Sequence, residues 1–305
     1  MSLMNQIACI AGPTASGKSA MAIKLAKKIG GEVINADALQ VYSDLRILSA
    51  RPSAAEEASV PHHLFGHIDP SVRYSVGQWL GEVEPVIIDV LARGRVPIVI
   101  GGTGLYFKAL TQGLAKVPAP SEAGKREAAA LLERGIEPLQ AAAARLDPLA
   151  FARILGKDPQ RLLRLTEVAL GTDKPLSAWQ AATRPLIPRG YWQGMVLLPE
   201  REGLYGRINA RFDQMASNGG MEEAARISAL GLDPMLPAMK AIGLRELMAV
   251  NSGDMTMEEG LGHAKRETRR FAKRQYTWFR GQAKDWPVAV TDAEREGFAA
   301  MLHRV

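Results

Sequence analysis

The chain has 305 residues, 47% of them hydrophobic and 23% charged, which is typical of a globular protein of one or two domains. No apolar run reaches membrane-spanning length and no secretory signal is visible. The single cysteine, Cys9, excludes an intrachain disulfide, and a thiol in an expected core strand favours a reduced, cytoplasmic protein. The net charge of +6 favours an anionic partner.

A phosphate-binding loop is the first motif of the chain. An apolar run at 7–11 predicts a buried strand, and an amphipathic run at 20–29 predicts a helix. Between them the chain fits the pattern G-x-x-x-x-G-K-[ST], in which backbone N–H groups surround phosphate oxygens at a helix N-terminus. We expect the lysine to neutralise a terminal phosphate and the serine hydroxyl to face Mg²⁺. The motif predicts that linked phosphates bind, without showing that they belong to ATP; the alternative is an ordinary surface loop. Its residues are Gly12, Pro13, Thr14, Ala15, Ser16, Gly17, Lys18 and Ser19.

The next strand is expected from Glu32 to Asp37, which would place Asp37 at the carboxyl edge of the sheet, where ligands bind in open α/β sheets. Asp37 is therefore a candidate magnesium-associated carboxylate or general base, and the alternative is a helix cap. A helix is expected from Val76 to Arg93, with a kink or a boundary at Pro85.

A third strand, 96–100, runs directly into Gly101-Gly102-Thr103-Gly104. Many ATP-hydrolysing phosphate-loop proteins have a magnesium-binding aspartate at such a strand end. Its absence disfavours ATP hydrolysis and favours backbone and Thr103 contacts to phosphate or substrate; the alternative is an ordinary strand-to-helix turn. The order of strands and helices predicts an α/β fold, a phosphate-loop doubly wound parallel sheet.

The composition predicts an interrupted core. We expect the first part of the α/β core at 4–115, an all-helical insertion at 116–190, and the return of the core with basic C-terminal helices at 191–305. Within the insertion, Ala-, Leu- and Arg-rich runs predict helices at 122–134, 138–146, 148–155 and 159–170. After it we expect a strand at 191–198 and helices at 204–216, 221–230 and 257–282.

The last of these helices carries most of the positive charge. On a helical wheel its basic residues from Lys265 to Arg274 occupy one half of the circumference, with Phe271 and Trp278 opposite. One face is thus expected to pack and the other to meet phosphates of a nucleic acid or a diphosphate, the alternative being a solvated surface. In the insertion, Arg161 and Arg164 with Gln160 are also typical of nucleic-acid contacts, although a solvated face explains them equally well. The basic residues of 261–284 are Lys265, Arg266, Arg269, Arg270, Lys273, Arg274, Arg280 and Lys284, against one acidic residue, Glu267.

Together these motifs resemble the tRNA dimethylallyltransferase family, also called tRNA isopentenyltransferase. The resemblance extends in order over almost the whole chain. It rests on the phosphate loop, Asn35-Ala36-Asp37, Gln40-Val41-Tyr42, Pro61-His62-His63-Leu64, Gly101 to Tyr106, Gln160-Arg161 with Arg164 and Glu167, Ala241-Ile242-Gly243 with Arg245-Glu246, and Ala272-Lys273-Arg274-Gln275 with Thr277-Trp278-Phe279-Arg280.

The resemblance implies transfer of a dimethylallyl group from dimethylallyl diphosphate to N6 of an adenosine next to the tRNA anticodon, with Mg²⁺ as cofactor. It makes Asp37 the general base and places Thr103 and Arg211 at the diphosphate, with Arg207 as the rival arginine. Gln40 would recognise the adenine edge. The partners are then the anticodon stem-loop and the diphosphate donor, and a monomer is the default. The implied tRNA-binding residues are Asp37, Ala38, Leu39, Gln40, Thr103, Lys125, Gln160, Arg161, Leu162, Leu163, Arg164, Lys273 and Arg274.

The chain departs from the family pattern at Ala38, where serine is usual, which puts the hydrogen bonding around the base in doubt. Two other functions remain to be separated from prenyl transfer. A small-molecule or nucleotide kinase would explain the phosphate loop and Asp37 but not the basic helix. A nucleic-acid-binding protein with a noncatalytic loop would explain the charge but not the intact loop.

Overall fold

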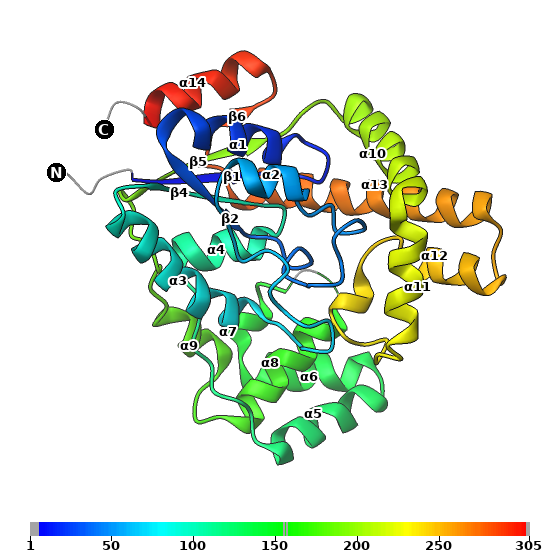
Figure 1. Cartoon of the computed structure of the whole chain (residues 1–305). Coiled ribbons are helices and arrows are strands. Elements are labelled where there is room, and N and C mark those ends of the chain that lie inside the picture. Colours follow the sequence, from blue (N-terminus) through cyan, green and yellow to red (C-terminus); the bar gives the residue numbers. More distant parts are fainter. Residues whose placement is uncertain (1–5, 155, 157, 303–305) are drawn as a thin grey trace. The chain divides into compact units, whose positions relative to one another are not determined.

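A parallel sheet forms the centre of the larger of the two units into which the chain folds (Figure 1). The computed structural model describes residues 6–154, 156 and 158–302. Within them all strand pairs are parallel, in the order β3-β2-β4-β1-β5-β6. This confirms the predicted doubly wound α/β core. The strands are β1 Ile7–Ala11, β2 Gly31–Asn35, β3 His62–His63, β4 Val96–Gly101, β5 Trp192–Leu197 and β6 Val288–Ala289.

The strand register places the functional loops at one edge. Ala11, the last residue of β1, pairs with Gly101 of β4 and with Val196 of β5. Because parallel strands share their direction, the segments that follow β1, β2 and β4 leave the sheet together. All five β1 residues are buried, as expected for a central strand covered on both faces.

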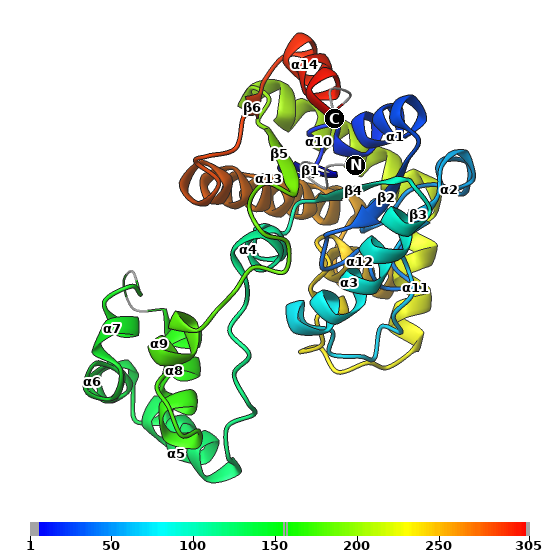
Figure 2. The same cartoon turned by 90° about the vertical axis from the view of Figure 1, so that its left-hand side faces the viewer.

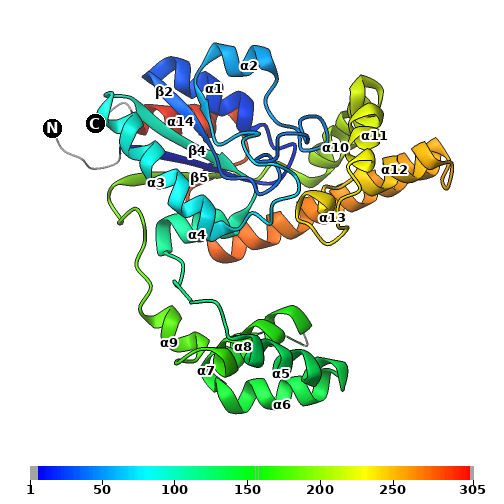
Figure 3. The ribbon, with the colours of Figure 1, turned by 60° about the horizontal axis from the view of Figure 1, so that its bottom comes forward.

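Helices cover both faces of the sheet (Figures 2 and 3). On one face α1 (Lys18–Ile29) and α14 (Asp292–Leu302) cover the strands, and Leu25 and Phe298 belong to the core cluster there. On the other lie α3 (Val76–Ala92), α4 (Gly104–Gln112) and α13 (Met257–Gln282). Trp79 of α3 stacks on Tyr106 of α4, and Phe107 meets Phe279 of α13. The remaining helices of this unit include α2 Ala54–Ser59, α10 Arg201–Met215, α11 Met221–Ala229 and α12 Leu244–Ser252.

In the second unit, Gln112–Leu186, all regular secondary structure among the described residues is helical. Asp147 and Asp158 each accept a hydrogen bond from a backbone N–H of the following helix, and proline follows both. Leu139, Leu162 and Leu165 pack in its small core. The unit is bounded by Gln112 and Leu186, whereas the sequence predicts an all-helical insertion at 116–190. Its helices are α5 Glu122–Glu133, α6 Ile136–Leu146, α7 Pro148–Phe151, α8 Pro159–Gly171 and α9 Leu176–Ala181.

Several element boundaries differ from the prediction. β2 ends at Asn35, two residues before Asp37, and α7 ends at Phe151 rather than 155, a position outside the described residues. α3 continues through Pro85, so of the two expectations there, a kink or a boundary, the boundary is excluded. Short elements such as α2, α9 and β6 have no counterpart in the elements expected from the sequence, and neither do α4, α12 and α14. No helix in the described part of the chain combines the length and apolar character needed to cross a bilayer.

Candidate active site

The phosphate loop joins β1 to α1 through three residues with positive φ angles. They are Gly12 at 153°, Ala15 at 61° and Gly17 at 90°. A Cβ atom on Gly12 would lie 2.6 Å from the Leu197 carbonyl oxygen, so the loop lies directly against the end of β5. A left-handed conformation is unfavourable for alanine and occurs mainly where surrounding structure enforces it, often at ligand sites. The loop therefore forms a tight turn before the α1 N-terminus, where the helix dipole favours an anion.

Two serine hydroxyl groups of this loop are available to a ligand. Ser16 is 2% exposed, and its Oγ has no hydrogen-bond partner within the described ranges. Ser19, the second residue of α1, has no recorded side-chain bond to any described residue. A buried hydroxyl without a partner is costly, and a phosphate oxygen would satisfy it. The Lys18 ammonium group folds back to donate to the Pro13 carbonyl oxygen at 2.7 Å.

Lys18, Arg211 and Asp37 interact electrostatically at this edge of the sheet. Burial lowers the pKa of Lys18 to about 8, Asp37 opposes this shift, and the nearby Arg211 guanidinium adds to it. Burial also lowers the pKa of Arg211, partly offset by Glu56. Both cations are thus destabilised in the free protein, because desolvation is not fully compensated by a neighbouring anion. A bound anion of high charge would compensate both.

Asp37 projects from a turn fixed by a buried asparagine. Asn35 Oδ1 accepts from the Asp37 N–H at 2.8 Å, and Asn35 Nδ2 donates to the carbonyl oxygens of Asp37 and Leu64, both at 3.0 Å. Asp37 Oδ1 accepts from the Leu39 N–H at 3.0 Å. Oδ2 has no recorded partner among the described residues. The next helix, α2, begins at Ala54 with Ser53 as its cap, so Asp37 does not cap a helix as the alternative supposed.

The Gly101-to-Gly104 turn adds Thr103 to this edge. The Thr103 Oγ1 accepts from the Ala38 N–H at 3.1 Å, which joins the turn to the Asp37 segment and leaves the hydroxyl proton available to another acceptor. A Cβ on Gly101 would lie 2.0 Å from the Ala36 carbonyl oxygen, so the two segments touch through their backbones. Residue 38 contributes only its backbone N–H to this bond, so alanine can make it just as serine would.

α10 supplies the two arginines that competed in the prediction. Exposed Arg207 donates through Nε to the Ala15 carbonyl oxygen at 3.0 Å, on the phosphate loop itself. Arg211, half-buried, is the one whose charge acts on Lys18. Because only Arg211 combines partial burial with an electrostatic effect on the loop lysine, its environment favours it over Arg207 for contact with a bound anion.

Gln40 lies in the same segment as Asp37, but its amide nitrogen is already bonded. Nε2 donates to the carbonyl oxygens of Ser49 and Ala50, at 3.0 and 2.8 Å. The 46–48 backbone is in turn held by the buried Glu223 carboxylate of α11. Gln40 therefore offers only its amide oxygen, and pairing with both adenine edge atoms would require these bonds to break.

The basic side of α13 divides into two groups. Lys265 pairs with Asp213 at 2.5 Å and Arg269 donates to Asn209 at 2.6 Å, so both are committed to α10. Lys273 and Arg274 are exposed, and Arg274 lies over the Phe271 ring. Ala272, Gln275 and Phe279 are buried on the opposite side, whereas Phe271 and Trp278, which the helical wheel placed there, are only half-buried.

In the second unit, Gln160, Arg161 and Arg164 are exposed at the start of α8, while Leu163 is half-buried. Arg161 pairs with Asp158 and Lys125 with Glu122, both three residues apart. Leu162 is fully buried in the unit's core, so its side chain is not available to RNA and the predicted contact there is limited to its backbone. Surface pairs of this kind are weak and exchange readily with phosphates.

Sequence reasoning missed the role of Gln275. Its side chain accepts from the Thr14 N–H of the phosphate loop and donates to the Gly102 carbonyl oxygen, both at 2.9 Å. The signal available was an amide side chain on the packing face of a basic helix, between the buried Ala272 and Phe279.

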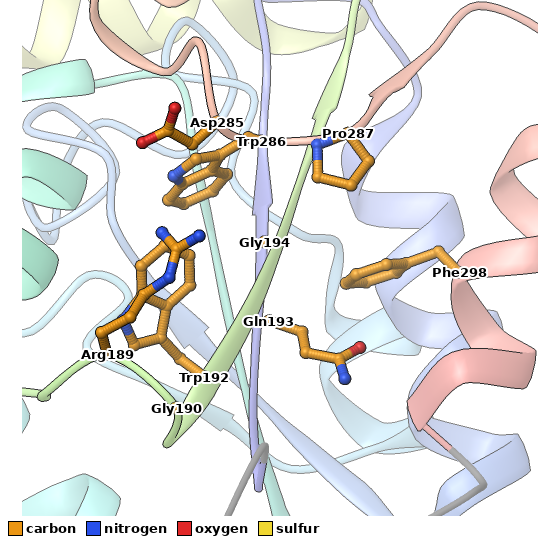
Figure 4. Close-up of a pocket in the computed structure, with 9 residues that line it drawn as sticks. All are labelled: Arg189, Gly190, Trp192, Gln193, Gly194, Asp285, Trp286, Pro287 and Phe298. Carbon is orange, nitrogen blue, oxygen red and sulfur yellow. The ribbon is translucent and has the colours of Figure 1, made fainter.

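A separate pocket of about 300 Å³ lies at the amino end of β5 (Figure 4). Trp192 and Trp286 line it, with their ring centroids 5.0 Å apart, and Arg189 lies over the Trp192 ring. Trp192 is the first residue of β5, whereas the phosphate loop follows the last residue of β1. The pocket is therefore at the opposite end of the strands and is not part of the candidate active site.

The chain matches two family models, "IPP transferase" over residues 40–282 and "Isopentenyl transferase" over residues 5–62. It is 50% identical to the tRNA dimethylallyltransferase of Maricaulis maris (strain MCS10), over 93% of each chain. It is also 50% identical to that of Bradyrhizobium sp. (strain BTAi1), over 98% of each.

Solved structures agree with this result. The tRNA isopentenylpyrophosphate transferase of Bacillus halodurans is similar at 32% identity and a TM-score of 0.70, over 98% of this chain and 96% of that one. A eukaryotic dimethylallyltransferase acting on tRNA is similar at 26% identity and a TM-score of 0.82, over 98% of this chain and 77% of that one. The chain belongs to the tRNA dimethylallyltransferase family.

Proposed function

We propose that this protein transfers a dimethylallyl group from dimethylallyl diphosphate to N6 of an adenosine adjacent to the anticodon of tRNA. One observation supports this beyond family membership. A phosphate loop with two incompletely compensated cations shares a sheet edge with a carboxylate that has a free oxygen. Such a site can bind a diphosphate and accept a proton beside it, which a prenyl transfer to an amine requires.

The diphosphate binds as the leaving group. As the carbon–oxygen bond of the donor breaks, negative charge grows on the departing oxygen, and donors already in position there lower the barrier. Lys18 and Arg211 supply positive charge, the Ser16 hydroxyl supplies an unpaired donor, and Thr103 retains its hydroxyl proton for the diphosphate.

Asp37 acts as the general base. A bond forms between N6 of adenosine and the carbon that the diphosphate leaves, and N6 transfers one proton to Asp37. The Oδ2 atom is the acceptor, because Oδ1 is bonded to the Leu39 N–H and fixes the carboxylate plane. An adenine amine is a poor nucleophile, so proton removal during bond formation contributes substantially to the rate.

Mg²⁺ fits this site with Ser19 as its protein ligand. The Ser19 hydroxyl lies at the start of α1 and is unpaired within the described residues, and Mg²⁺ commonly combines one protein oxygen with phosphate oxygens and water. When bound, the ion supplies charge neutralisation for the diphosphate.

The tRNA contacts are proposed on both units. Basic side chains at exposed or partly exposed positions can bind the phosphates of the RNA backbone. These are Lys273 and Arg274 on α13, and Lys125, Arg161 and Arg164 on the second unit. The target adenosine must leave its base stack to reach Asp37. Gln40 would accept one hydrogen bond through its amide oxygen.

One assay tests the proposal. Purified protein is incubated with unmodified tRNA, labelled dimethylallyl diphosphate and Mg²⁺, and label is measured in the RNA and mapped by nuclease digestion. Label on an adenosine next to the anticodon supports it. Phosphorylation of a small molecule by ATP, with no label in the tRNA, would favour a kinase instead.

A further inference from the structure

One side chain of α13 connects the two loops to which we assign the diphosphate. Gln275 accepts from the Thr14 N–H through Oε1 and donates to the Gly102 carbonyl oxygen through Nε2, each at 2.9 Å. Its partners are one donor and one acceptor, so they fix which end of the amide faces which loop. Gln275 is 6% exposed, and both its polar ends are paired.

The turn that carries Thr103 is shaped to fit α13. A Cβ on Gly102 would lie 2.2 Å from Gln275 Nε2, and a Cβ on Gly104 would lie 2.2 Å from the Trp278 ring. Neither glycine has a positive φ, so what these positions require is space rather than a special backbone conformation. The two glycines on either side of Thr103 thus accept two α13 side chains that are three residues apart. This arrangement limits movement of the Thr103 backbone.

The same helix also contacts the other side of the phosphate loop. Ala272, three residues before Gln275, belongs to a buried cluster with Leu204 and Ile208 of α10, against which Ala15 packs. A Cβ on Gly102 would also lie 3.3 Å from the Gly12 carbonyl oxygen, so the turn and the phosphate loop are close neighbours. Gln275 is the hydrogen-bonding group that spans them, with no charge that would compete with a diphosphate.

We propose that Gln275 is a positioning residue that sets the spacing between the phosphate loop and the Thr103 turn, and so the affinity for the diphosphate of the donor. This deepens the proposed function and rests on it for the identity of the donor. Gln275 does not touch the reacting atoms. It acts through the backbones of Thr14 and Gly102, which hold the phosphate loop and the Thr103 turn in place.

The test compares two variants of the same buried helix face. Gln275→Met keeps the length of the side chain but removes both hydrogen bonds. Phe279→Leu, one turn further along, is the control: Phe279 is 2% exposed, packs on Phe107 and Trp278, and its side chain has no hydrogen bond to either loop. Both substitutions lower stability, but only the first alters the loop spacing. Thermal unfolding is recorded for each, and all assays are run well below both transitions.

For Gln275→Met we expect a rise of about 10- to 100-fold in the KM for dimethylallyl diphosphate, because displacements of about 1 Å at a distance from the chemistry can have effects of that size. The dissociation constant for tRNA should stay within about twofold of the unmodified protein, and Phe279→Leu should leave the KM unchanged. Gln275→Glu, which keeps the acceptor for Thr14 but loses the donor to Gly102, should also raise the KM.

A second measurement separates this inference from the proposed function. Inorganic pyrophosphate with Mg²⁺ is titrated calorimetrically into the unmodified protein, Gln275→Met and Phe279→Leu, with no tRNA and no turnover. Weaker binding to Gln275→Met alone supports the positioning role even if prenyl transfer is not observed. Equal pyrophosphate affinity in all three proteins, or an equal loss in both variants, would overturn it.

Discussion

The Asn35 side chain binds both backbone polar groups of Asp37, accepting from its N–H at 2.8 Å and donating to its carbonyl oxygen at 3.0 Å. Asn35 is itself fully buried, and its own carbonyl oxygen accepts from the Trp79 indole at 2.8 Å. The proposed base is thus held by a residue at the end of β2, within the rigid sheet. A base on a short, fixed turn keeps its free oxygen directed to one place.

Loss of this support is expected to affect both stability and turnover. Asn35→Ala removes three side-chain hydrogen bonds and leaves buried backbone groups unpaired, so the free energy of unfolding should fall by about 3 kcal/mol or more. The kcat should also fall, because Asp37 is no longer held in position. Urea unfolding and steady-state kinetics check the two effects. A stable variant with normal kcat would show that the Asn35 bonds do not position the base.

Asp37→Asn should reduce kcat by about 100- to 10,000-fold, the range found when a general base is removed. The asparagine oxygen can still accept from the Leu39 N–H, so the turn and the tRNA affinity should be preserved. Single-turnover transfer and a filter-binding assay with tRNA measure the two quantities. A parallel loss of binding and turnover would argue that Asp37 contributes to RNA binding rather than to proton transfer.

The affinity for pyrophosphate should depend on the ionisation of Lys18. Burial lowers the pKa of this group to about 8, so the free protein carries the charge below that pH and loses it above. An anion binds the protonated form, so above pH 8 binding requires proton uptake and the affinity falls by up to about tenfold per pH unit.

Lys18→Arg is the matched control, because arginine stays charged over this range. Pyrophosphate itself also titrates, but that affects both proteins equally and drops out of the ratio of their affinities. The affinities of the two proteins are measured by calorimetry over about three pH units, from about pH 6.5 to about 9.5. Their ratio should change only above about pH 8. A ratio that stays constant throughout would mean that Lys18 does not titrate in the free protein.

Removal of charge from α13 should weaken tRNA binding in a salt-dependent way. In the double variant Lys273→Gln and Arg274→Gln, two exposed cations are lost, and the slope of log affinity against log salt should become shallower by about 1.5. Lys265→Gln is the control, because Lys265 is paired with Asp213 and should leave the slope nearly unchanged. An unaltered slope in the double variant would exclude this face of α13 from the tRNA interface.

The sequence predicted the elements whose signals are local. The phosphate loop, the strands of the central sheet and the full extent of α13, Met257–Gln282, depend on residue spacing within a few turns. The short elements were missed because a strand of two residues, such as β6, or a helix of six, such as α9, contains too few residues for a period to be recognised. α3 passes through Pro85 because packing against the sheet stabilises a helix that local propensity would interrupt.

The residues of the site were predicted in part, where a local sequence signal indicated their position in the sheet. Asp37 and Thr103 were expected near the phosphate loop because strand ends of a parallel sheet meet at one edge. The resemblance to the family favoured Arg211 but kept Arg207 as a rival, since both lie on one face of α10. Only their burial and contacts separate them: Arg207 binds the Ala15 carbonyl oxygen, whereas Arg211 acts on Lys18.

The sequence by itself thus determined the chemistry available, namely a phosphate loop, a strand-end carboxylate and a one-sided basic helix, because these follow from residue types at short spacing. The tertiary structure decided which groups are bonded to one another. Gln275 meets Thr14 and Gly102 across 261 and 173 residues of chain, and no local period reports contacts of that separation. Such contacts exist only once the sheet and α13 have packed, and they determine how the site is held.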